Sequence, residues 1–223
     1  MKNVLPILLL PFLFFACNNS QYSECNEMMA VCSNSNEPYC LFGFDFTNNK
    51  KSETNKNAIL ISYSFQTKGQ KVSTHTEDSL ISLSFSQLIP CSQQSIERAF
   101  RAYEGVTNLK FVKKQNELDS DIKFFVADMG DKRAAVSFPN FESGRCEKIS
   151  GNIIINSRVN GHSCESFYVF MLHEIGHALG LGHVRSDNIM NPDTYKKHNK
   201  IQQGDSVGLI KIYGRKLEKE IAL

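Results

Sequence analysis

The stretch His173–His183, HEIGHALGLGH, holds three of the six histidines of this 223-residue chain within eleven residues. On a helix, side chains four positions apart lie on the same face, so His173 and His177 present their imidazoles toward one point. Gly180 is the residue type that ends a helix in a left-handed conformation, after which the chain can turn back sharply. That turn would return His183 to the same point. We therefore expect three imidazoles around one metal ion.

The same stretch places a carboxylate beside the expected metal site. Three histidines with one open coordination position are typical of catalytic zinc, which lowers the pKa of a bound water toward about 7. Glu174 points about a hundred degrees away from His173 around the helix, so we expect it beside the open position as a general base. This pattern predicts amide hydrolysis at a single zinc ion. The alternative is a buried helix whose histidines only hydrogen-bond, but such a helix gains nothing from three polar rings on one face.

The spacing from His173 to His183 matches H-E-x-x-H-x-x-G-x-x-H in full, so the chain resembles the metzincin metalloproteases. Asn188–Pro192, NIMNP, resembles the methionine turn that lies beneath the metal in that clan, with Met190 as its methionine. The closest resemblance is to the matrixins, the matrix metalloprotease branch, and it covers about residues 57 to 215. Outside the metal site it is carried by Ser95–Tyr103, Val106–Phe111, Asp121–Lys123 and Ile201–Gly214.

The resemblance implies an α+β fold with a twisted, mostly parallel sheet, an antiparallel edge strand, a zinc-site helix and a C-terminal helix. It implies that residues 134–138, with Ala135 and Val136, form the edge strand above the cleft and pair with an extended substrate. Pro192 and Tyr195 would form the wall of the pocket for the residue after the cut. Metzincin pockets at this place are usually apolar, which implies a hydrophobic substrate residue. A plain strand and a plain loop are the alternatives for these two segments.

Two departures from the matrixin pattern shape our expectations. Val184 follows His183 where matrixins usually have serine, which makes the clan more secure than the branch. The segment between Asp128 and Phe138 lacks the set of histidines and acidic residues that holds a structural zinc and calcium in animal matrixins. We therefore expect one metal ion.

Hydrophobic periodicity independently predicts an α+β domain from Asn57 onward. Alternating apolar residues predict strands near residues 59–65, 81–85, 109–111, 122–126, 134–138 and 152–155. Helical spacing predicts helices over residues 96–106, 165–179 and 205–213. Ser92 or Ser95 is expected to cap the first helix and Ser163 the second.

The first residues read as a targeting signal. One lysine precedes an apolar run from Val4 to Ala16 that is too short to span a bilayer comfortably, so residues 1–16 are interpreted as a signal peptide. Phe14–Cys17 resembles a bacterial lipobox, which implies lipidation of Cys17 and anchoring to a bacterial membrane, with the outer membrane or cell surface favoured. A plain secreted protein and an uncleaved anchor are the alternatives. We expect a lipidated, cysteine-rich segment over residues 17–56, a catalytic domain over 57–215 and a tail over 216–223.

Cysteine parity agrees with an exported chain. Of seven cysteines, six remain if Cys17 carries lipid, and an even number suggests up to three disulfides whose pairing the sequence does not select. Residues 38–40, PYC, are the nearest approach to the matrixin inhibitory motif, but the arginine and glycine of that motif are missing. Cys40 is therefore interpreted as a disulfide cysteine, and a Cys40 thiolate that caps the zinc is the alternative.

Composition removes one class of function. The formal net charge is only +2, with acidic and basic residues interspersed, which argues against a nucleic-acid partner. The leading hypothesis is a monomeric zinc endopeptidase that acts on protein or peptide substrates and reaches the membrane through its N-terminal lipid. The alternative is a catalytically silent surface protein that keeps the metzincin fold for binding or adhesion.

Overall fold

The computed structural model describes residues 32, 36–42, 46, 58–72, 80–115, 119–131, 133–141, 149–159 and 162–216. The predicted signal peptide, Cys17, Cys25, Cys146 and residues 217–223 lie outside this part of the chain. Within the described ranges, no helix has both the length and the apolar character needed to cross a membrane. The predicted boundaries between tether, catalytic domain and tail stay predictions.

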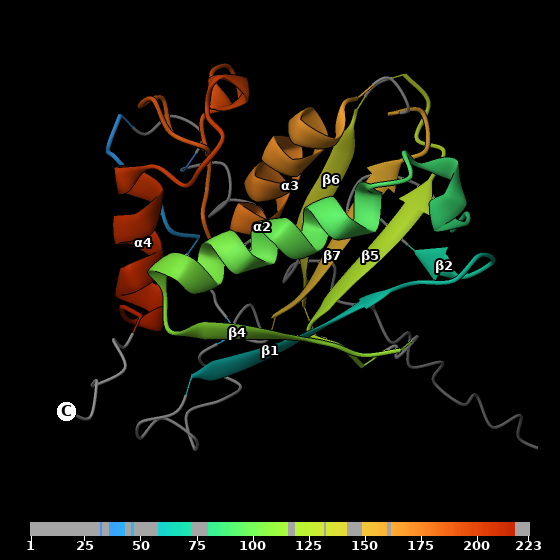
Figure 1. The fold of residues 1–223 in the computed structure, drawn as a ribbon, viewed down its shortest axis with the longest axis horizontal. Helices are drawn as coiled ribbons and strands as arrows, with labels where there is room; N and C mark the ends of the chain where they lie inside the picture. Colours follow the sequence, from blue (N-terminus) through green and yellow to red (C-terminus); the bar gives the residue numbers. More distant parts are fainter. Residues whose placement is uncertain are drawn as a thin grey trace, which may run out of the picture.

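A five-stranded sheet forms the centre of the fold (Figure 1). Its strands, in spatial order, are β4 (Leu109–Lys113), β1 (Ile59–Phe65), β5 (Ile122–Ala127), β7 (Ile149–Asn156) and β6 (Ala135–Phe141). The first four run parallel, and β6 pairs with β7 in the antiparallel direction at the sheet edge. The predicted α+β fold with an antiparallel edge strand is thus confirmed.

Helices α2 (Ser92–Val106) and α3 (Cys164–Ala178) lie together on one face of this sheet, while α4 (Gln203–Tyr213) stands at its side (Figure 1). Ser163 caps α3 as predicted, because its hydroxyl accepts a hydrogen bond from the Ser166 amide. The predicted serine cap of α2 is wrong. Cys91 occupies the N-cap position without a side-chain hydrogen bond, and its disulfide to Cys164 ties the starts of the two helices together.

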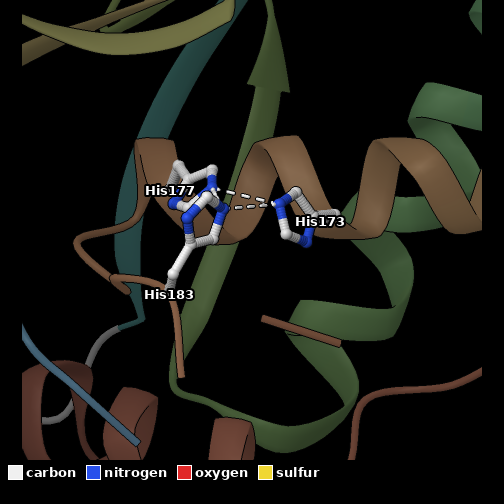
Figure 2. Close-up of side chains that lie close together, drawn as sticks. All are labelled: His173, His177 and His183. Atoms are coloured by element: carbon white, nitrogen blue, oxygen red, sulfur yellow. Dashed lines mark hydrogen bonds between the residues drawn. The ribbon is translucent and has the colours of Figure 1, made fainter. Parts of the chain in front are cut away.

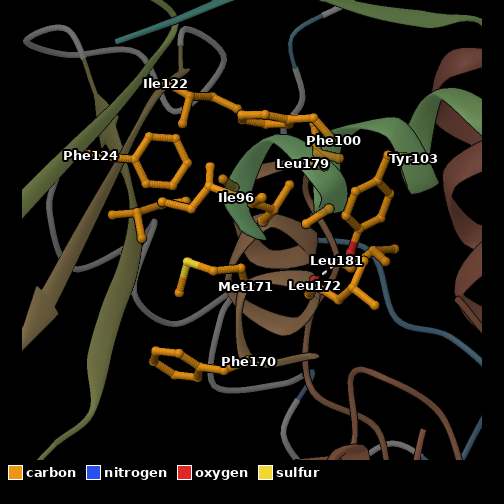
Figure 3. Close-up of a cluster of buried hydrophobic side chains, with 14 of the residues drawn as sticks. Ile96, Phe100, Tyr103, Ile122, Phe124, Phe170, Met171, Leu172, Leu179 and Leu181 are labelled. Atoms are coloured by element: carbon orange, nitrogen blue, oxygen red, sulfur yellow. Dashed lines mark hydrogen bonds between the residues drawn. The ribbon is translucent and has the colours of Figure 1, made fainter. Parts of the chain in front are cut away.

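Strand alternation separates two hydrophobic clusters. Ile122, Phe124 and Val126 of β5 face α2 and α3 in the main core, shown in part in Figure 3. Phe125 and Ala127 face the other way and pack in a smaller cluster. That cluster is covered by the hairpin of β2 (Lys71–Val72) and β3 (Leu80–Ile81). The period of two seen in the sequence therefore corresponds to two buried faces of unequal size.

One predicted strand is shorter than its pattern suggested. Of residues 81–85, Ile81 ends β3, Leu83 forms an isolated bridge with Val126, and Phe85 begins the 3₁₀ helix η2 (Phe85–Gln87). The reason is local, since the Ser84 hydroxyl accepts a hydrogen bond from the Ser86 amide and starts a helical turn. Conversely, β6 begins one residue later than the predicted 134–138 but continues to Phe141, and β7 extends beyond the predicted 152–155 at both ends.

Two disulfides, Cys32–Cys40 and Cys91–Cys164, join described residues. The interpretation of Cys40 as a disulfide cysteine is thus confirmed, and the alternative of a zinc-capping thiolate at this position is wrong. Cys32, Phe42 and Phe46 are buried in the same core as the sheet and helices. The described part of the N-terminal segment therefore packs into the body of residues 58–216.

Candidate metal centre

Three imidazole nitrogens meet at one point. The Nε2 atom of His173 lies 3.1 Å from those of His177 and His183, and the last two lie 3.0 Å apart. Figure 2 shows the first two rings projecting from α3 and the third approaching from the chain beyond the helix. They form the one group of metal-ligand side chains brought together among the described residues.

The return of the chain depends on the glycine at the end of α3. Gly180 has a φ of +99°, in the left-handed region that favours glycine. The amide of Leu181 donates to the carbonyl of Gly176, and the amide of Gly180 donates to that of His177. These two bonds define a Schellman motif, which ends the helix and reverses the chain. The turn expected at Gly180 is present, and it brings His183 back to the helix.

The other nitrogen of each helical ligand fixes its tautomer. His173 Nδ1 lies 2.7 Å from the carbonyl oxygen of Ile189, and His177 Nδ1 lies 2.8 Å from that of Leu181. A carbonyl only accepts, so both Nδ1 atoms carry hydrogen and both Nε2 atoms present lone pairs. Two facing lone pairs repel each other at 3.1 Å unless a cation lies between them. The arrangement therefore fits a zinc ion bound by three neutral imidazoles.

Burial keeps these imidazoles in the metal-binding form. Desolvation lowers the pKa of His173 to about 4 and also lowers the pKa of His177 and His183. The three rings are thus neutral at pH 7. Metal ions bind the neutral form of histidine, so no proton has to be displaced at that pH.

Met190 lies beneath the metal-site helix. A Cβ added to Gly176 would approach the Met190 sulfur to 2.5 Å, so the small residue between the two helical ligands allows this close packing. The Asp205 carboxylate accepts hydrogen bonds from the amides of Ile189 and Met190, at 3.0 and 3.3 Å. Asp205 was not anticipated from the sequence. A Gln202-to-Asp205 capping box is readable there, but its contact with the methionine turn is not.

Glu174 is buried beside the ligands on the same helix. Its side chain is 7% exposed, and desolvation raises the pKa of its carboxyl to about 8. The Tyr195 ring packs 4.8 Å from the His173 ring, measured between centroids. Burial and then the charge of Glu174 raise the pKa of Tyr195, which places this carboxylate near the tyrosine. A carboxyl that holds a proton near neutral pH suits proton transfer.

A pocket opens beside Tyr195, with a volume of about 630 Å³. Val169 is its one aliphatic lining residue, and the rest are polar, aromatic or charged. These are His162, Ser163, Glu165, Ser166, Tyr195, Lys196, Lys197, His198 and Asn199. Pro192, expected as part of the wall, is exposed and does not line this pocket. The lining is thus more polar than the resemblance implied.

Ala135 and Val136 lie on edge strand β6, as expected, but they differ in orientation. The Asn156 amide donates to the Ala134 carbonyl, so the register makes Val136 a hydrogen-bonded partner of Ile154. Ala135 lies between such pairs, and its backbone groups therefore point to the open edge. Of the two residues, Ala135 is the one that could pair with an added strand.

A mostly parallel sheet with an antiparallel edge, placed beside a helix that ends in a three-histidine site, defines a zinc metalloprotease of the metzincin type. A sequence model of the matrixin family, peptidase family M10, matches residues 86–214, more than half of the chain. The chain belongs to the matrixin family. Comparison with curated proteins gives no match.

Proposed function

We propose that this protein is a zinc-dependent endopeptidase in which Glu174 is the general base. Bound zinc would supply acidification of a water and polarisation of the scissile carbonyl. Its ligands would be His173, His177 and His183. Glu174, in its ionised form, would accept the proton of the attacking water and then pass it to the leaving amine, and its burial on the metal-site helix supports this role.

The observation that carries the proposal is that one helix holds both a buried carboxyl and two histidines whose Nε2 lone pairs already point at one place. A zinc site alone would suit a silent binding protein as well as an enzyme. A buried carboxyl has an unfavourable desolvation energy, and a protein that only binds has no use for it. The endopeptidase is therefore favoured over the adhesion protein.

The test is Glu174→Gln in the full-length chain, with Glu97→Gln on α2 as a control that removes the same charge elsewhere. We expect E174Q to bind zinc like the wild type and to lose casein cleavage by about a hundredfold or more. E97Q should retain activity. Full activity in E174Q would reject the base, and a zinc-loaded but inactive wild type would favour the silent binder.

The pocket beside Tyr195 supports a substrate with an acidic side chain next to the cleaved bond. Glu165 pairs with Arg98, and His198 pairs with Asp187. Lys196 and Lys197 form no ion pair with the described residues, so they leave the pocket positively charged. A long carboxylate side chain suits this lining better than the hydrophobic residue expected from the family resemblance.

The site of action proposed is the outer surface of a bacterial membrane, with Cys17 as the lipid carrier and the catalytic domain as a monomer. Two disulfides among the described residues support export, because disulfides persist in oxidising compartments. Labelling with a radioactive fatty acid measures the lipidation of Cys17 directly. Equal labelling of wild type and Cys17→Ala would contradict the anchor.

A further inference from the structure

A segment outside the family match contacts the metal-site loop. Residues 36–42, here called the strap, precede the matched residues 86–214. The amide of Gly182 donates to the Cys40 carbonyl, and the amide of Phe42 donates to the Gly180 carbonyl, both at 2.9 Å. Leu41 and Leu181 thereby form an antiparallel bridge. The strap thus pairs with residues 180–183, here called the bend, which carry His183.

Close packing accompanies this pairing. A Cβ added to Gly182 would lie 2.4 Å from the Cβ of Cys32 and 2.8 Å from the Phe42 ring. Glycine at position 182 is therefore explained by the strap and its disulfide. The Phe42 ring also stacks on the ring of His177, with centroids 5.8 Å apart and planes 20° apart. The strap consequently supports one zinc ligand directly and a second through the bend.

The other end of the strap reaches the chain between His183 and Met190. The Pro38 carbonyl accepts a hydrogen bond from the Asn188 side chain at 2.8 Å, and the Glu37 carbonyl accepts one from the Ser186 hydroxyl at 3.1 Å. Gly204 at the start of α4 leaves room for the same Pro38 carbonyl. The strap thus contacts both the bend and the chain that follows it between His183 and Met190.

The Cys32–Cys40 disulfide is the covalent link that closes this arrangement. Cys32 is 2% exposed, and it occupies the space beside Gly182. Cys40 supplies the carbonyl that binds the Gly182 amide. Breaking the link would free the strap to leave the bend, because a closed loop restricts the alternative conformations of the chain.

We propose that the strap is a positioning element for the zinc site and that its Cys32–Cys40 disulfide makes zinc retention depend on oxidation. This inference rests on the proposed zinc-protease function. Because the disulfide persists only under oxidising conditions, the site reaches full zinc affinity in an oxidising compartment and stays weak in a reducing one. The newly made enzyme would be restrained until export.

The test compares two disulfides in the full-length chain. Cys32→Ala/Cys40→Ala removes the strap link, whereas Cys91→Ala/Cys164→Ala removes the link between α2 and α3 and is the matched control. Zinc Kd is measured by competition with a chromophoric chelator, below the melting temperature of each variant. We expect the first pair to weaken zinc binding about ten- to a hundredfold, as loss of outer support typically does. The control pair should lower thermal stability and leave zinc Kd unchanged.

Phe42→Ala provides a second variant that keeps both disulfides. It should weaken zinc binding and alter the absorption spectrum of the Co²⁺-substituted protein, which reports ligand geometry. A water-soluble phosphine should weaken zinc binding by the wild type but have no further effect on C32A/C40A. The phosphine turns the disulfide into two thiols and becomes a phosphine oxide with oxygen from water. A phosphine is used in place of a dithiol reagent, because the thiolates of a dithiol bind zinc themselves.

Wild-type zinc Kd in both C32A/C40A and F42A, or an equal loss in C91A/C164A, would overturn the proposal. The experiments can refute the strap proposal and the proposed protease function independently of each other. Zinc affinity that depends on the strap in a protein without proteolytic activity supports the strap and refutes only the endopeptidase. Cleavage by a wild type whose zinc Kd is indifferent to the strap refutes only the strap.

Discussion

At the scale of single residues, the metal centre is prepared by contacts behind the ligands. The Ile189 and Leu181 carbonyls hold the Nδ1–H groups of His173 and His177, so each Nε2 lone pair faces inward. Tyr103, fully buried on α2, donates its hydroxyl to the Leu172 carbonyl next to the first ligand. These contacts fix ring orientation, and zinc binding therefore requires little rearrangement.

The charge of two pocket residues gives a prediction at this scale. Lys196→Glu/Lys197→Glu should lower the ratio of kcat/KM for a peptide with Glu beside the cleaved bond to that for its Leu counterpart. Exposed ion pairs contribute up to about 1 kcal/mol each, so we expect roughly a two- to tenfold change. The measurement is a competitive digest of the paired peptides. Lys200→Glu, outside the pocket lining, is the charge control. A wild type that prefers Leu would contradict the acidic preference.

At the scale of elements, edge strand β6 is the strand that the family resemblance implies would pair with a substrate. Ala135→Pro removes one outward N–H group, and proline is tolerated at sheet edges where that group is not used by the neighbour. We expect kcat/KM to fall about two- to tenfold, the effect of one lost hydrogen bond, with unchanged zinc Kd. Steady-state kinetics on a quenched peptide measures it. Ala135→Gly keeps the N–H group and should behave like the wild type, and unimpaired kinetics in A135P would place the substrate elsewhere.

The elements differ in how far the sequence predicts them. Strong periodicity predicted β1 (Ile59–Phe65) and β5 (Ile122–Ala127), and the Ser163 cap marked the start of α3. The N-cap of α2 was not predicted, because Cys91 occupies it without a side-chain hydrogen bond and instead forms a disulfide to a residue 73 positions away. The three-histidine convergence was readable since all its ligands lie within one helix and one turn.

The supporting contacts of the site were not readable for the same physical reason. Asp205 meets the methionine turn across 15 or 16 residues, and Phe42 meets His177 across a far longer stretch of chain. Neither contact follows a local period. Gly182 carried a signal in retrospect, because a glycine that no turn requires indicates a close neighbour.

At the scale of the whole molecule, the three-histidine site joins segments that are also linked to one another by hydrogen bonds. The ligands come from α3 and from the bend after it, and the bend in turn contacts the strap. The chain between His183 and Met190 is further held by Asp205 at the start of α4. A bound ion therefore stabilises several parts of the fold at once, and zinc removal should lower the stability of the entire domain.

Calorimetry with and without chelator measures this coupling. At about a thousandfold excess of free zinc over its Kd, binding to the folded state alone contributes about 4 kcal/mol. For a domain of this size, that difference corresponds to a fall in Tm of roughly 10 °C when zinc is removed. Added zinc should restore the transition, and His183→Ala should show a much smaller chelator-dependent shift because two imidazoles remain. Identical transitions in wild type with and without chelator would mean that the three histidines hold no ion, since any ion bound only by the folded chain must raise its Tm.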